Sequence, residues 1–329
     1  MGREETATAT SQTEAYTALS RLLPSAIKPR DGLVMEDGRN LGVPKRILAQ
    51  AFVEARKLFF QNAKDEDGRA LALRATRVIL LFDPEHLTAA NFRKRSLLAL
   101  QSDDTPAAQW AYRKALQYEF CFLDSILTSP LHRQSKSPTL WHHRLWLSQL
   151  ALPSNVEAVP EDAPAEFWRR ELVSVCKSGE RHPKNYYAWQ YARSLVNRVD
   201  GMEATIDFAH VVKDWCCQHP SDTSGWSCLL FLIPKIEPLA KRTALVRQVL
   251  GYGLELRLEH EALWVLIRTI VADEALQQEA ADICVALREY VTEIEDFGGS
   301  NVLIGRVRNT LTWIEKYGHS SECRRIHSD

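Results

Sequence analysis

A tryptophan-centred motif recurs along this 329-residue chain, and a tandem repeat restricts the possible folds more than any other feature of a sequence. Five copies carry a residue at the same position of the motif, an alanine in the first copy and a tryptophan in the others: Ala90, Trp141, Trp189, Trp226 and Trp264. In three copies a proline stands six residues earlier: Pro84, Pro183 and Pro220. The copies lack the signature and the regular period of about 34 residues that define a tetratricopeptide array, so that architecture is the weaker alternative.

Each copy is typical of the beginning of a helix. The residues four positions before the aromatic position are His86, Ser137, Asn185, Asp222 and His260. Ser, Asn and Asp are preferred N-caps because their side-chain oxygen accepts a hydrogen bond from a backbone N–H of the first turn. A large ring one turn after the cap can reach a neighbouring helix. The repeated unit is therefore a capped helix with a buried aromatic near its start, and we expect the four tryptophans to be structural.

The remaining pattern is also helical, because apolar residues recur on one face of successive segments. From residue 87 onward it predicts helices at about 87–101, 106–127, 139–151, 164–178, 185–198, 201–217, 222–233, 236–256, 260–272, 275–297 and 300–317. We predict an all-α fold, an α-α superhelix or solenoid of stacked antiparallel helical hairpins, as a single domain with five repeats over 44–329. Residues 1–43 are expected to be an irregular lead-in with one short helix around Ser11–Leu23, and 129–138 and 153–164 are expected to be loops.

Composition excludes several classes of function. A net charge of −1 gives no general attraction to nucleic acid. The sequence has no run of about 18 apolar residues, so no membrane span is expected. Seven cysteines without a secretory signal favour reduced thiols and a cytoplasmic location. The segment 216–219, Cys-Cys-Gln-His, comes nearest to a metal cluster, but helical cysteines beside Trp215 are more typical of a core. No metal or cofactor is expected in this chain.

Two of the helix starts carry a more specific resemblance. The stretch 185–189, Asn-Tyr-Tyr-Ala-Trp, and the stretch 141–144, Trp-His-His-Arg, match the two halves of the pattern Asn-Tyr-x-x-Trp-x-x-Arg. That pattern resembles the repeats of protein prenyltransferase alpha subunits, most closely the divergent branch called prenyltransferase alpha-subunit repeat-containing protein. The resemblance extends over about 80–320. It implies a crescent of hairpins wrapped around a beta subunit, which carries the zinc, the lipid pocket and most catalytic groups.

The resemblance also implies which residues meet the substrate. In the family, the lysine at the position of Lys136 reaches the isoprenoid diphosphate, and the positions of Asn185, Tyr186 and Tyr187 face the same pocket. We therefore expect catalytic roles for Lys136 and Tyr187, and substrate-binding roles for Lys184, Asn185 and Tyr186. A lysine just before a helix start is unfavourable for the helix dipole unless an anion binds there. The alternative is that both lysines are solvated loop residues.

Departures from the pattern keep a second function open. The arginine three residues after the aromatic position is present as Arg93 and Arg144, for which we expect structural roles, but it is absent from the three later copies. In two of those copies Arg193 and Arg268 stand one position later. Pro138 occupies a position where the family often has Tyr. These losses favour a non-catalytic helical scaffold for protein–protein interaction.

The first hypothesis remains the alpha subunit of a heterodimeric protein prenyltransferase, inactive alone. It would help transfer a geranylgeranyl group, in preference to farnesyl, to a C-terminal cysteine of an acceptor protein. The expected partner is a prenyltransferase beta subunit, with the Rab-type geranylgeranyl transferase beta subunit favoured.

Overall fold

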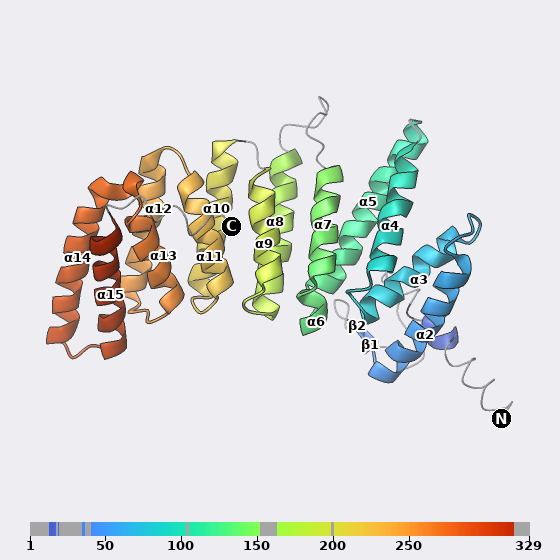
Figure 1. Ribbon diagram of the computed structural model, residues 1–329, viewed down its shortest axis with the longest axis horizontal. Coiled ribbons are helices and arrows are strands. Elements are labelled where there is room, and N and C mark those ends of the chain that lie inside the picture. The colour runs from blue at the N-terminus through green and yellow to red at the C-terminus, as the bar shows by residue number, and fades with distance from the viewer. Residues whose placement is uncertain are drawn as a thin grey trace. The chain divides into compact units, whose positions relative to one another are not determined.

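The computed structural model describes residues 13–17, 19, 35–36, 41–102, 105–151, 163–198 and 201–318. Almost every described residue lies in a helix or in a short turn between helices, so the predicted all-α fold of stacked helical hairpins is confirmed (Figure 1). The strands among the described residues are one antiparallel pair of two residues each, β1 (Met35–Glu36) and β2 (Leu41–Gly42). The chain divides into two compact units, Met1–Glu157 and Ala158–Asp329, and each has its own buried core.

Unit 1 is built from helical hairpins. Helix α2 packs on α3, α3 on α4 and α5 on α7, and a short 3-10 turn, η1 (Leu100–Ser102), follows α4. The helices are α2 (Lys45–Asn62), α3 (Arg69–Phe82), α4 (Leu87–Ala99), α5 (Pro106–Leu127), α6 (His132–Ser135) and α7 (Pro138–Ala151). The segment 129–138 was expected to be a loop, and that expectation is wrong in part because it contains the single turn α6.

Unit 2 has two layers of helices (Figure 1). The second helices of successive hairpins, α9, α11, α13 and α15, pack side by side, and the first helices α8, α10 and α12 do the same in the other layer. The helices are α8 (Ala163–Arg181), α9 (Tyr186–Val196), α10 (Met202–Gln218), α11 (Thr223–Leu232), α12 (Leu239–Glu255), α13 (Glu261–Val271), α14 (Gln277–Asp296) and α15 (Asn301–Tyr317). Two 3-10 turns join them, η2 (Ile233–Lys235) and η3 (Glu274–Leu276).

The four repeated tryptophans lie inside the helical layers, each at most 2% exposed. In three of them the indole Nε1–H donates to the carbonyl oxygen six residues earlier, at 2.8 Å for Trp141, 2.9 Å for Trp226 and 2.7 Å for Trp264. This bond holds the turn that precedes the helix against the indole ring. The same side chain therefore packs inside the hairpin and fixes the conformation of the turn that leads into the helix. The indole N–H of Trp189 has no acceptor among the described residues, and its ring packs edge-on against Trp215 of the next hairpin at 4.7 Å.

The helix starts are capped as the sequence indicates. Asn185, Asp222 and Ser137 each accept from a backbone N–H of their helix. His86 does the same through Nδ1, at 3.2 Å from the N–H of Ala89, although histidine is an uncommon cap. His260 makes no side-chain cap.

Caps also connect one repeat to the turn before it. The hydroxyl of Ser137 donates to the carbonyl oxygen of Pro84 at 3.2 Å. Asp222 accepts from the backbone N–H of Lys184 at 2.5 Å, and Ser300, the cap of α15, donates to Glu259. Each bond joins two helix starts of adjacent repeats within one unit, which gives the stack a fixed register.

The expected lead-in lies mostly outside the described residues. Residues 13–17 and 19 are helical, with Ala15, Tyr16 and Leu19 buried. The rest of the helix expected around Ser11–Leu23, and the loop expected at 153–164 up to residue 162, are outside the part that the structure describes. The division into one lead-in and one domain stays a prediction.

Candidate functional site

Lys136 stands in unit 1 at the junction of α6 and α7. It is half-buried and immediately precedes Ser137, whose hydroxyl accepts from the N–H of Leu140 at 3.1 Å. Pro138 is the first residue of α7 and is exposed, at a position where its missing N–H costs no hydrogen bond. The backbone of Lys136 is therefore held by a helix on either side, so the point from which its side chain extends is fixed.

The start of α9 in unit 2 gathers the other predicted residues. Lys184 is exposed and has a left-handed backbone, with φ of 59°. Such a conformation costs a residue with a Cβ about 1 kcal/mol or more. The N–H of Lys184 donates to Asp222, and this bond to the next repeat holds the backbone in place. Its exposed side chain thus extends from a constrained turn directly before the helix.

Asn185 has a structural role that is observed directly. Its side chain is fully buried, its Oδ1 accepts from the N–H of Ala188 at 3.4 Å, and its Nδ2–H donates to the hydroxyl of Ser178 at 2.9 Å. The amide therefore caps α9 and ties it to α8. The substrate contact predicted for Asn185 stays a prediction.

Tyr186 and Tyr187 form an exposed aromatic pair on the first turn of α9. They are 57% and 40% exposed, and their rings meet edge to face with centroids 5.5 Å apart. The first turn of a helix has backbone N–H groups without intrahelical acceptors and the positive end of the helix dipole. Tyr186, Tyr187 and Lys184 are exposed at that end, so their side chains can donate hydrogen bonds to an anion.

The structure thus brings Lys184, Tyr186 and Tyr187 together in unit 2, whereas Lys136 belongs to unit 1. A shared pocket for Lys136 and Tyr187 stays a prediction.

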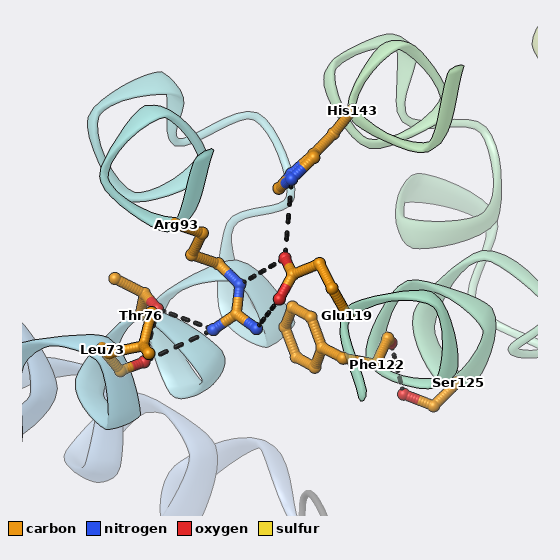
Figure 2. A network of polar contacts seen from close by, with 7 residues as sticks. All are labelled: Leu73, Thr76, Arg93, Glu119, Phe122, Ser125 and His143. Atoms are coloured by element: carbon orange, nitrogen blue, oxygen red, sulfur yellow. Dashed lines mark hydrogen bonds and ion pairs between the residues drawn. The ribbon is translucent and has the colours of Figure 1, made fainter. Parts of the chain in front are cut away.

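A buried polar network in unit 1 was not predicted from the sequence. Figure 2 shows Arg93 of α4 pointing at Glu119 of α5, with the guanidinium 2.7 Å from one carboxylate oxygen through Nε and bonded to the other through Nη2. Nη1 donates to the hydroxyl of Thr76 at 2.9 Å, and the ring of Phe122 lies 4.1 Å from the guanidinium carbon. Nε2 of His143 is 3.5 Å from Glu119. These contacts join α3, α4, α5 and α7.

Burial sets the charge states of this network. Desolvation alone would raise the pKa of Glu119, but the charge and hydrogen bonds of Arg93 hold it below its ordinary value. Burial lowers the pKa of His143 to about 4, although the neighbouring carboxylate of Glu119 opposes the shift. At neutral pH the network therefore holds one ion pair and a neutral imidazole, which is a packing arrangement. The one sequence feature that points to this network is a single Glu within the mostly apolar stretch 116–123.

The arginines of the repeated helices fall into two groups by their contacts. Arg93 and Arg144, three residues after the aromatic position, both point to α5, where Arg144 meets Asp124 at 3.4 Å. Arg193 and Arg268, one position later, point to the second helix of the next hairpin instead. Arg193 bonds Ser227 of α11, and Arg268 lies over the ring of Trp313 of α15 at 4.7 Å. The shift of one residue therefore changes which helix the arginine contacts.

The described cysteines of unit 2 are buried or half-buried. Burial raises the pKa of the Cys176 thiol to about 12 and that of Cys216 well above its ordinary value. Among the residues that the structure describes, no three His, Cys, Asp or Glu side chains are grouped so that they could hold a metal ion. In the same part of the chain, no helix combines the length and the apolar character needed to cross a bilayer.

Comparisons with known proteins agree with the repeats. A family model described as the ECM9 middle domain matches residues 140–249. The human protein prenyltransferase alpha subunit repeat-containing protein 1 is 25% identical over 197 residues, which are 56% of this chain and 45% of the human protein. Protein ECM9 of Saccharomyces cerevisiae is 26% identical over 191 residues, which are 57% of this chain and 47% of that protein.

A more distant kind of relative is an enzyme subunit. The geranylgeranyl transferase type-2 subunit alpha of Rattus norvegicus is 26% identical over 188 residues, which are 57% of this chain and 29% of that subunit. The match thus spans less than half the length of each of these relatives. Together with the repeated helix starts, these relatives confirm the resemblance: the chain is a homologue of the prenyltransferase alpha-subunit repeat-containing proteins and of ECM9.

Proposed function

We propose that this chain is the alpha subunit of a heterodimeric protein prenyltransferase. In this proposal it wraps a beta subunit and contributes side chains to the isoprenoid diphosphate, while an acceptor protein presents its C-terminal cysteine. Geranylgeranyl is the favoured lipid, and a Rab-type geranylgeranyl transferase beta subunit is the favoured partner. Similarity to a geranylgeranyl transferase alpha subunit supports both preferences.

The exposed pair Tyr186 and Tyr187 at the start of α9 carries the proposal. The repeated tryptophans of this chain are buried. These two instead face outward beside Lys184, at the helix end that attracts anions. A diphosphate bound there would find the backbone N–H of Tyr187, two phenol donors and an ammonium group, whereas the N–H groups of Tyr186 and Ala188 are already bonded within the turn.

The chemistry asked of these residues is stabilisation of a leaving group. In the transfer, the bond between the allylic carbon and the diphosphate oxygen breaks, a carbon–sulfur bond to the acceptor cysteine forms, and the thiol proton is released. Lys136 and Tyr187 donate to the departing diphosphate as its negative charge grows, which lowers the barrier. Lys184 and Tyr186 hold the diphosphate in position, and the buried cap Asn185 fixes the turn from which they extend. Zinc, expected in the beta subunit, makes the acceptor thiol a better nucleophile.

The test is single-turnover transfer of a labelled geranylgeranyl group by the chain co-expressed with a beta subunit. Lys136→Ala is expected to slow the transfer about 100-fold, the usual effect of removing one donor to a developing anion. Lys57→Ala is the matched control, because Lys57 is an exposed lysine of the same unit on α2. If no beta subunit forms a complex with the chain, the proposal is wrong.

A second function is supported by the departures from the family pattern. Arg193 and Arg268 both contact the next repeat, and Pro138 lacks the hydroxyl that the family often has there. These features suit a helical scaffold that binds a partner without taking part in catalysis. In a complex that forms normally, unchanged turnover of Lys136→Ala would favour this scaffold.

A further inference from the structure

Most of the arginines that follow the repeated aromatic position have a carboxylate beside them. Arg93 is bonded to Glu119, Arg144 lies 3.4 Å from Asp124, and Arg268 lies 3.6 Å from Glu261. The pattern is expected, because a guanidinium removed from water is costly unless an opposite charge accompanies it.

Arg193 departs from this pattern. Its Nη2–H donates to the hydroxyl of Ser227 at 2.5 Å, and the ring of Phe231 lies 5.9 Å from the guanidinium carbon. Its Nε is buried and has no acceptor among the described residues, and no described carboxylate lies within ion-pair distance. Nε of Arg268 lacks an acceptor in the same way, so what sets Arg193 apart is its charge, which no carboxylate in the described part of the chain matches.

The repeat at α13 shows what is missing at α9. Glu261 stands three residues before Trp264, and from there it reaches Arg268. The same position in α9 is Tyr186, three residues before Trp189, which has no carboxylate to offer. The neighbouring Cys228 is hydrogen-bonded to Arg193 but does not supply a negative charge, because burial raises the pKa of its thiol to about 12 and the thiol stays neutral at pH 7.

A second cation lies on the same surface. Nζ of Lys235 is 4.6 Å from the centre of the Phe231 ring, and Lys235 is exposed. Two cations therefore lie against one half-buried aromatic ring at the junction of α9 and α11. We refer to Arg193, Ser227, Phe231 and Lys235 as the α9–α11 cationic surface. Arginine and aromatic side chains grouped in this way are typical of the residues that dominate binding energy at protein interfaces.

We propose that the α9–α11 cationic surface binds an acidic segment of the beta subunit, with a carboxylate of that segment paired to Arg193. The inference rests on the proposed function, because that function names the partner. The isoprenoid diphosphate is not the anion concerned. Arg193 follows Tyr186 by seven residues and so lies about 10 Å further along α9. A diphosphate at the helix start and a carboxylate at Arg193 can therefore be bound together.

The experiment measures the affinity of the full chain for the beta subunit with two variants that remove the unmatched charge in different ways. Arg193→Ala deletes the guanidinium. Ser227→Asp keeps it but places a carboxylate beside it, so that the pair forms within the chain and the beta subunit loses its contact. Arg169→Ala is the control, because Arg169 is an exposed arginine of the same unit whose partner is Asp207 at 3.0 Å.

The inference predicts that both variants raise the dissociation constant at least tenfold, whereas Arg169→Ala changes it less than twofold. It also predicts that the affinity of the unmodified chain falls more steeply with added salt than that of Ser227→Asp, because one ion pair fewer is screened. If both variants bind the beta subunit as tightly as the unmodified chain does, the inference is overturned and the proposed function stands. If no beta subunit binds the chain, both are overturned.

Discussion

Replacing Asp222 tests whether caps hold adjacent repeats together. This carboxylate is only 2% exposed and accepts three backbone hydrogen bonds. One oxygen takes the N–H groups of Ser224 and Gly225 at 2.9 Å each, which caps α11, and the other takes the N–H of Lys184 at 2.5 Å. Asp222→Ala removes the cap, worth about 1 kcal/mol, and leaves the N–H of Lys184 without its acceptor, worth about 1–2 kcal/mol more.

The expected loss is therefore about 2–3 kcal/mol of the free energy of unfolding of unit 2, measured by urea denaturation with far-UV circular dichroism. Asp222→Asn keeps an oxygen for the cap but offers an amide to Lys184, so it should cost about half as much. Ser221→Ala, an exposed neighbour, is the control and should stay within about 0.5 kcal/mol.

Amide hydrogen exchange separates the two effects. In Asp222→Asn the N–H of Lys184 should exchange faster while those of Ser224 and Gly225 keep their protection. If Asp222→Ala were as stable as the unmodified chain, or if Lys184 exchanged at its original rate in both variants, the bond between helix starts would not stabilise the stack.

Three further outcomes follow from the packing. Folding lowers the pKa of His143 from an ordinary value of 6.5 to about 4, so the unfolded chain binds this proton first as the pH falls. The free energy of unfolding should therefore fall by up to about 3 kcal/mol between pH 6.5 and pH 4. His143→Leu should flatten that dependence on pH in urea titrations. Trp226→Phe loses a hydrogen bond that Trp189→Phe does not, so thermal unfolding of Trp226→Phe should show an additional loss of about 1 kcal/mol; equal losses would contradict this role of the indole. Gly225→Ala places a Cβ 2.7 Å from a neighbouring indole ring and should destabilise, whereas Gly251→Ala, in a helix with room for a Cβ, should stabilise by about 0.5–1 kcal/mol in the same assay.

Much of the fold could be predicted because the helix ends are marked in the sequence. Helix α3 spans Arg69–Phe82 and ends where Asp83 and Pro84 stop it. The caps Asn185 and Asp222 locate the starts of α9 and α11 within one residue. By contrast, α6 is one turn long and lies in a segment rich in Ser and Pro, where no period of apolar residues can be recognised.

Less of the site could be predicted, because the spacing of nearby residues does not indicate which side chains of different helices contact each other. The position of Arg93 is evident from the repeat, but its partner Glu119 lies 26 residues away on another helix. The repeat likewise gives Trp189 the same position as the other tryptophans, yet its N–H has no acceptor among the described residues. The left-handed backbone of Lys184 is held by a hydrogen bond from its N–H to Asp222, 38 residues later, and no pattern around Lys184 indicates it.

Whether this chain is one half of a heterodimer is decided by the mass of the particle that it forms. The purified chain is mixed with a Rab-type geranylgeranyl transferase beta subunit and passed through size-exclusion chromatography with light scattering. The account predicts a single species whose mass equals one copy of each chain, 37.5 kDa coming from this one. Separate elution of the two chains at micromolar concentration, with this beta subunit and with the other prenyltransferase beta subunits, would contradict it.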